Sequence, residues 1–155
     1  LSHGTEMNLR IPALIPEDYL PDVHNRLMLY KRIASVDNNE ALKELQVEMI
    51  DRFGLLPEPA KNLIRQTGLR LEAEALGIVK VDAGKEWARL EFGSSTPVDP
   101  LVLVKKVQSG PDQYRLEGAN SFRFRLKDAT TGGKLDGISR MLGELGPTKR
   151  NASGS

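Results

Sequence analysis

The 155-residue chain contains no cysteine and only two histidines, and this scarcity removes several kinds of site. Without cysteine there is no disulfide, no thiolate zinc site and no cysteine nucleophile. The two histidines, His3 and His24, lie far apart in the sequence, and two distant histidines make a poor zinc site. A chain without cysteine is compatible with a reducing cytoplasm, where we expect this protein to be located.

Aromatic residues make up only 5% of the chain, and long apolar runs are missing. No run approaches the roughly 18 residues that a membrane helix needs, and the first ten residues show no secretory signal pattern. We therefore expect no membrane partner. Because the chain starts without methionine and ends in a polar stretch, we expect a piece of a larger protein, with residues 1–148 as one domain and residues 149–155 as a disordered tail.

Apolar residues recur at helical spacing three times in the first half of the chain. A short strand over residues 7–11 precedes these segments. Prolines then interrupt the chain until Pro21, which fits the first position of a helix. We predict helices over about residues 21–34, 38–53 and 58–76, the second capped by Asp37 or Asn38 and ended by Gly54.

The second half changes its period from helical spacing to strict alternation. It reads as two strand-strand-helix units without sequence similarity to each other. Two such units predict a four-stranded antiparallel sheet backed by helices, so the fold class is α+β. The predicted strands cover residues 78–81, 87–92, 114–117 and 122–127, and the predicted helices cover residues 99–108 and 135–145.

One segment comes close to a phosphate-binding loop without matching it. The stretch Thr131–Leu135 contains Gly-Gly-Lys, but the first required glycine falls on Asp128, and Leu135 cannot bind magnesium. We interpret the segment as a loop that starts a helix. The sequence therefore predicts no catalytic residue, no cofactor and no metal.

Acidic side chains gather on one side of the second predicted helix. At about 100° per residue, Glu40, Glu44, Glu48 and Asp51 fall within a narrow arc opposite the apolar stripe. No basic residue falls inside this arc, and like charges at four-residue spacing repel one another. The pattern alone leaves two interpretations open: a solvated face, or a docking face for a basic partner surface.

Basic side chains alternate along the last predicted strand. Arg123, Arg125 and Lys127 share one face, which suggests as an alternative function a nucleic-acid-binding accessory module. Phe122 and Phe124 belong to the opposite, core face, so these rings cannot stack on bases from the basic side. A solvated sheet face is therefore the preferred interpretation.

Three segments carry a resemblance to a known family. The stretches Ile11–Val23, Tyr30–Ala34 and Glu48–Pro57 resemble the C-terminal domain of bacterial transcription-repair coupling factors, the Mfd proteins. The likeness is specific through about Gly77 and spans roughly residues 5–145 in all.

This resemblance implies a non-catalytic, autoinhibitory domain of a DNA translocase in transcription-coupled DNA repair. In the family, the domain packs on an N-terminal module that resembles UvrB, masks UvrA binding and restrains ATPase activity and translocation, and RNA polymerase binds upstream. The family's interface acids match Glu48 and Asp51, which meet arginines of that module, and the helical wheel adds Glu44. The docking interpretation therefore gains weight, and we do not expect this domain to bind DNA by itself.

Overall fold

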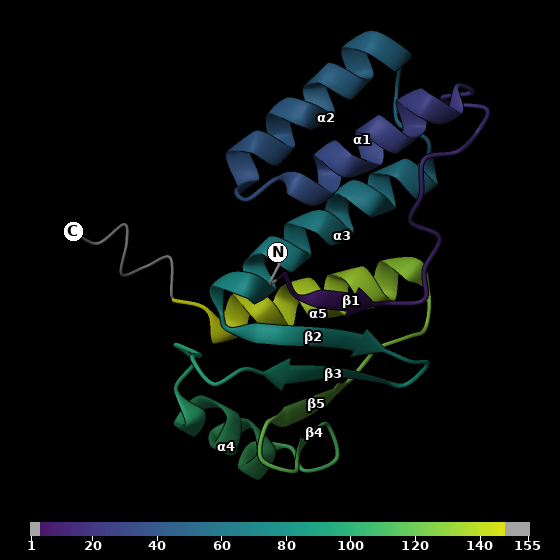
Figure 1. The fold of residues 1–155 in the computed structure, drawn as a ribbon. Helices are drawn as coiled ribbons and strands as arrows, with labels where there is room; N and C mark the ends of the chain where they lie inside the picture. The colour runs from purple at the N-terminus through teal and green to yellow at the C-terminus, as the bar shows by residue number, and fades with distance from the viewer. Residues whose placement is uncertain (1–3, 148–155) are drawn as a thin grey trace, which may run out of the picture. The chain divides into compact units, whose positions relative to one another are not determined.

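The computed structural model describes residues 4–147 of the chain, so the predicted tail lies outside the described residues. Within these residues, five helices and five strands confirm the α+β class (Figure 1). The described residues divide into two compact units, one of residues 11–71 and one that joins residues 4–10 to residues 72–147. The elements are β1 (Glu6–Asn8), α1 (Val23–Ser35), α2 (Asn39–Phe53), α3 (Glu58–Ala75), β2 (Ile78–Ala83), β3 (Trp87–Phe92), α4 (Pro100–Ser109), β4 (Tyr114–Glu117), β5 (Ser121–Arg125) and α5 (Thr131–Leu145).

The helical unit, residues 11–71, is built on one apolar cluster that α1, α2 and the first part of α3 share. Its members within the helices lie at helical spacing, so each helix buries one stripe and leaves the opposite side in water, while Ile15, Leu20 and Leu56 join from connecting segments. The buried members of this cluster are Ile15, Leu20, Leu29, Ile33, Leu42, Leu45, Met49, Leu56, Ala60 and Ile64.

Among residues 4–147, no helix combines the length and apolar character that crossing a membrane requires.

Polar caps decide where α1 and α2 begin. Helix α1 starts two residues later than predicted, because the Asp22 carboxylate accepts a hydrogen bond of 2.9 Å from the backbone N–H of Asn25. Of the two predicted caps of α2, Asn38 is the one that acts, since its side chain accepts 2.8 Å from the N–H of Ala41. Gly54 ends α2 with φ at 97°, a conformation that favours glycine.

The sheet has five strands in the order β1-β2-β3-β5-β4. The four strands of the second half pair antiparallel, as predicted. The short N-terminal strand adds a fifth member and runs parallel to β2. Lys134 of α5 secures the end of this strand, because its buried Nζ donates 2.9 Å to the carbonyl oxygen of Leu9.

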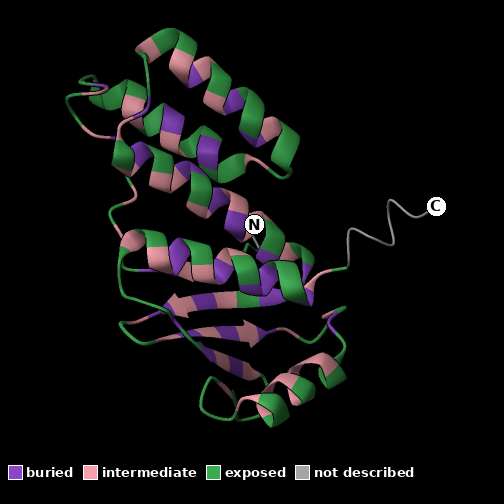
Figure 2. Ribbon diagram, turned by 180° about the vertical axis from the view of Figure 1, so that it is seen from behind, coloured by how far each residue is buried: buried purple, intermediate pink, exposed green. Residues whose placement is uncertain are grey.

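The two faces of the sheet differ in character. Alternate residues of β3 and β5 point to one face, where Leu90 and Phe122 are completely buried. Helix α5 crosses this face and contributes Leu135, Ile138 and Leu142 to the core (Figure 2). The prediction that the phenylalanines of β5 face the core is confirmed, and the opposite face carries the charged residues of the strands.

We expect Phe122→Ala to lower the free energy of unfolding by about 3–5 kcal/mol, because the substitution removes a fully buried ring and leaves a cavity. Denaturant unfolding followed by circular dichroism measures the change. The control Leu101→Ala, on the exposed side of α4, should change stability by less than about 0.5 kcal/mol. An equal loss from both substitutions would contradict the assignment of Phe122 to the core.

Candidate interaction faces

Helix α2 turns the three predicted site residues toward solvent, on the side opposite its buried stripe. Glu44 and Asp51 are exposed, and the Glu48 side chain remains 38% exposed. Val47 lies between them at helical spacing and is 57% exposed. We call Glu44, Val47, Glu48 and Asp51 the α2 face, which combines an exposed apolar side chain with carboxylates around it.

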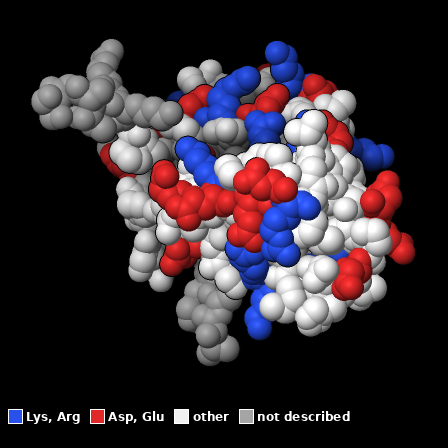
Figure 3. Space-filling model, turned by 90° about the horizontal axis from the view of Figure 1, so that it is seen from above, with Lys and Arg blue, Asp and Glu red and all other residues white. Residues whose placement is uncertain are grey.

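The α2 face is not the uncompensated acidic row that the helical wheel predicts. Arg32 of α1 donates from Nη1 to Oε2 of Glu48 at 2.6 Å and from Nη2 to Oε1 at 2.8 Å. Arg52, one turn further along α2, donates to Oε2 at 3.1 Å. The arc on α2 itself holds no basic residue, as predicted, but the packing of α1 on α2 brings Arg32 to Glu48, which a single-helix wheel cannot show. The space-filling view from above shows acidic side chains with basic side chains directly beside them (Figure 3).

These ion pairs keep Glu48 charged. Hydrogen bonds from Arg32 and then Arg52 lower the pKa of the Glu48 carboxyl from its ordinary value of 4.5 to about 2. The three hydrogen bonds use three of its roughly four acceptor positions, so Oε1 retains room for one further donor. Asp51 and Glu44 make no ion pair within residues 4–147, which leaves both carboxylates available to a partner.

A second charged surface lies on the open face of the sheet. Arg89 of β3, Arg123 of β5 and Arg115 of β4 stand directly opposite one another across three neighbouring strands. Trp87 joins them, because the guanidinium carbons of Arg123 and Arg125 each lie 4.5 Å from the centre of its ring and that of Arg115 lies at 5.8 Å. We call these five residues the arginine–tryptophan cluster.

Trp87 is a candidate site residue that was not predicted from the sequence. Its two-residue spacing from Arg89 placed it on the charged side of its strand, and this signal was available. What the spacing could not show was the register, which sets Trp87 opposite Arg125. The prediction that Phe122 and Phe124 lie on the core face is confirmed, and the aromatic ring on the basic face is that of Trp87.

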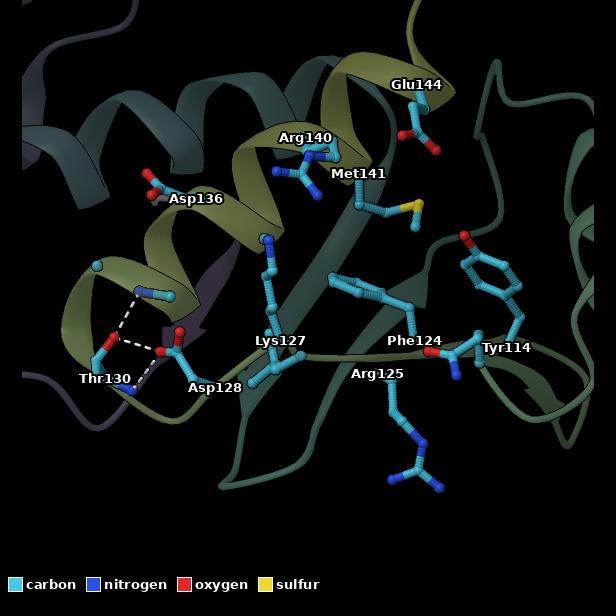
Figure 4. A pocket seen from close by; sticks show the side chains of 15 residues that line it. Tyr114, Phe124, Arg125, Lys127, Asp128, Thr130, Asp136, Arg140, Met141 and Glu144 are labelled. Atoms are coloured by element: carbon cyan, nitrogen blue, oxygen red, sulfur yellow. Dashed lines mark hydrogen bonds between the residues drawn. The ribbon is translucent and has the colours of Figure 1, made fainter.

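Lys127, predicted to continue the basic face, lies elsewhere. Strand β5 ends at Arg125, after which the chain leaves the sheet and alternation no longer applies. The Lys127 side chain points toward α5 and lines a cavity of about 610 Å³, whereas Arg125 points away from that helix (Figure 4).

The loop that resembles a phosphate-binding motif borders the same cavity. It forms an ordinary helix start. Thr130 caps α5 by accepting 2.9 Å from the N–H of Gly133, and it donates to Asp128. The hydrogen bonds that the hydroxyl and then the backbone N–H of Thr130 donate to Asp128 lower the pKa of that carboxyl. Lys134, the lysine of the near-match, is buried against backbone carbonyls and cannot reach a ligand in the cavity. Within residues 4–147, no group of three or more His, Asp or Glu side chains is placed to hold a metal.

A family model of the TRCF domain matches residues 9–103. The chain belongs to the TRCF domain family. This TRCF domain is 46% identical over 123 residues to the transcription-repair-coupling factor of Haemophilus influenzae, a match that covers 79% of the chain and 11% of that relative. It is 39% identical over 144 residues to the factor of Escherichia coli, covering 93% of the chain and 12% of that relative. The chain therefore spans little more than a tenth of the length of these relatives.

The fold of this TRCF domain is similar to that of a solved structure as well. A crystal structure of the C-terminal domain of a transcription-repair coupling factor superposes with a TM-score of 0.77 at 22% identity. The match covers 92% of this chain and 91% of that chain. At this identity the likeness establishes the shared α+β fold.

We expect Glu48→Gln to be less stable than the wild type at neutral pH, with a difference that disappears on acidification. Because folding lowers the pKa of Glu48, its ionised form stabilises the fold above pH 4.5, and this contribution is lost as the pH falls from 4.5 toward 2. Thermal melts of both proteins across this range measure the effect. The control Glu44→Gln, on the same helix without an ion pair, should melt like the wild type. A Glu48→Gln deficit that stays constant with pH would contradict the role of the two arginines.

Proposed function

We propose that this TRCF domain is a non-catalytic, autoinhibitory interaction domain that docks through the α2 face onto the UvrB-like N-terminal module of the same coupling factor. Docking masks the UvrA-binding surface of that module and restrains ATPase activity and translocation. The observation that carries the proposal is the exposure of Asp51, Glu44 and Val47 side by side on one rigid helix.

The size of the chain relative to its relatives supports an intramolecular partner. Only 11% and 12% of two curated coupling factors correspond to this chain. We propose that residues 1–148 form one regulatory domain, and that the motor and the sites for UvrA and RNA polymerase lie in the rest of the protein. A tethered partner is met at high effective concentration, so a modest interface is enough to keep the closed form populated.

The members of the α2 face contribute in different ways. Asp51 and Glu44 can each accept an arginine of the partner with both carboxylate oxygens. Val47 supplies apolar contact area at the centre, where water is excluded. Glu48 adds one remaining acceptor position, and its main effect is to hold α1 against α2 through Arg32. Asp51 is therefore the residue that we expect to dominate the binding energy.

Such an interface is suited to being released. An ion pair at an exposed rim contributes about 1 kcal/mol or less, and a pair that becomes dry on binding contributes more. A few pairs of this kind hold the closed form against thermal opening and yield to a larger competing interaction. Engagement of RNA polymerase or DNA by the upstream domains would supply that competition.

In the full-length coupling factor, we expect Asp51→Ala to increase UvrA binding and basal ATPase activity, because the closed form loses its main ion pair. Between the separate N-terminal module and the 155-residue chain, the same substitution should weaken binding about tenfold, or about 1.4 kcal/mol. Isothermal titration measures the affinity, and a steady-state assay measures the ATPase rate.

Two controls separate docking from folding. Asp112→Ala removes the same charge from an exposed turn of the other unit and should leave all three quantities unchanged. Arg32→Ala removes the partner of Glu48 while the α2 face keeps its acids, so it should lower stability and preserve docking. Unchanged UvrA binding, ATPase activity and affinity in the Asp51→Ala protein would refute the proposal.

A further inference from the structure

We propose that the open face of the sheet binds a short segment of single-stranded nucleic acid through the arginine–tryptophan cluster. The cluster lies on β3, β5 and β4, in the unit that does not contain α2. It shares no residue with the α2 face. This inference therefore stands or fails independently of the docking function.

The cluster contains a row of like charges. Arg89, Arg123 and Arg115 are direct neighbours across three strands, and like charges that stand directly opposite each other destabilise a sheet. Arg125 adds a fourth charge, since its guanidinium and that of Arg123 lie beside the same indole ring. Separations below the Debye length of about 10 Å are poorly screened by salt. A bound polyanion would remove the repulsion among these arginines.

The acids near the cluster do not neutralise it. Glu117 lies 3.3 Å from Arg123 and Glu86 lies 3.6 Å from Arg125, and their side chains are 40% and 76% exposed. Ion pairs this open to water contribute little and can be exchanged for phosphate. Arg115 makes no ion pair within residues 4–147.

Arg89 and Arg123 also keep unused donor capacity. The carboxylate nearest to Arg89 is that of Asp82, at 3.8 Å, and Arg10 engages the same carboxylate at 2.6 Å. The buried Nε of Arg123 has no hydrogen-bond partner, so Glu117 leaves this guanidinium incompletely satisfied.

The presence of Trp87 in the cluster favours nucleic acid over other polyanions as the ligand. Proteins bind single strands with arginines that contact the phosphates and with aromatic rings or guanidinium planes on which the bases stack. The open sheets of RNA recognition motifs are an example. An acidic peptide would use the arginines and gain nothing from the indole. Glu6 lies on β1, and Glu91 lies at the opposite end of β3 from Trp87, so the nucleic acid would run along the start of β3 and across β5 and β4.

The protein carries its own probe, because Trp87 is its single tryptophan. The 155-residue chain is titrated with oligothymidylate of about 12 nucleotides at about 50 mM salt, and tryptophan fluorescence is followed. Stacking of a base on the cluster quenches this fluorescence. The affinity should fall with salt with a slope of about −2 on logarithmic axes, the value for three neutralised phosphates on a single strand.

Matched variants separate stacking from charge, with anisotropy of a labelled oligonucleotide as the readout. Trp87→Leu should weaken binding at least about fivefold and leave the salt slope unchanged, since no charge is lost. Arg115→Ala should reduce the magnitude of the slope by about 0.7. Lys61→Ala, which removes one exposed charge from α3 in the other unit, should bind like the wild type. Arg115 is exposed, so its variant carries the test even if Trp87→Leu fails to fold.

Three results would overturn the inference. The first is no binding of the oligonucleotide at low salt. The second is equal affinity for duplex DNA of the same length. The third is equal or tighter binding of a polyglutamate peptide without quenching of Trp87, which would assign the cluster to an acidic protein partner instead.

Discussion

Strand β3 is the central strand of the sheet, and the alternation of its side chains determines what each face can do. Its even-numbered residues are small or apolar and are buried under α5. The side chains of its odd-numbered residues therefore point to the opposite face, toward solvent, whatever their chemistry. A shift of the register by one residue would exchange the two sets and place Trp87 and Arg89 in the core, so the stability of the core also maintains the arginine–tryptophan cluster.

In the helical unit, too, the packing of the core determines which surface side chains are available to a partner. The apolar stripe of α2 packs on α1, and this contact brings Arg32 within reach of Glu48. As a result, one member of the acidic arc is held by its own unit while Asp51 and Glu44 stay open. Glu48 thus holds α2 against α1, while Asp51 and Glu44 remain available to a partner. Because the helix is already held in place, less conformational entropy is lost when a partner binds.

The two faces differ in how they hold their charge. On the α2 face, the acid nearest to α1 is paired at close distance, and the unpaired acids flank an apolar centre. In the arginine–tryptophan cluster, the arginines outnumber their weakly held acids and surround an aromatic ring. A basic protein surface complements the first arrangement, and a polyanion with flat bases complements the second, so one small domain can serve two partners of opposite charge.

From the sequence it was possible to predict the α+β class, most element boundaries and the acidic side of α2, because helical spacing, alternation and capping residues are local properties. The match of Glu48 and Asp51 to interface acids came from resemblance to the family. Three features required tertiary structure: the parallel pairing of β1, the ion pair of Glu48 with Arg32 and the meeting of Trp87 with arginines of β4 and β5. Each joins residues that are distant in the chain, and no periodicity within one element records which neighbour it will meet.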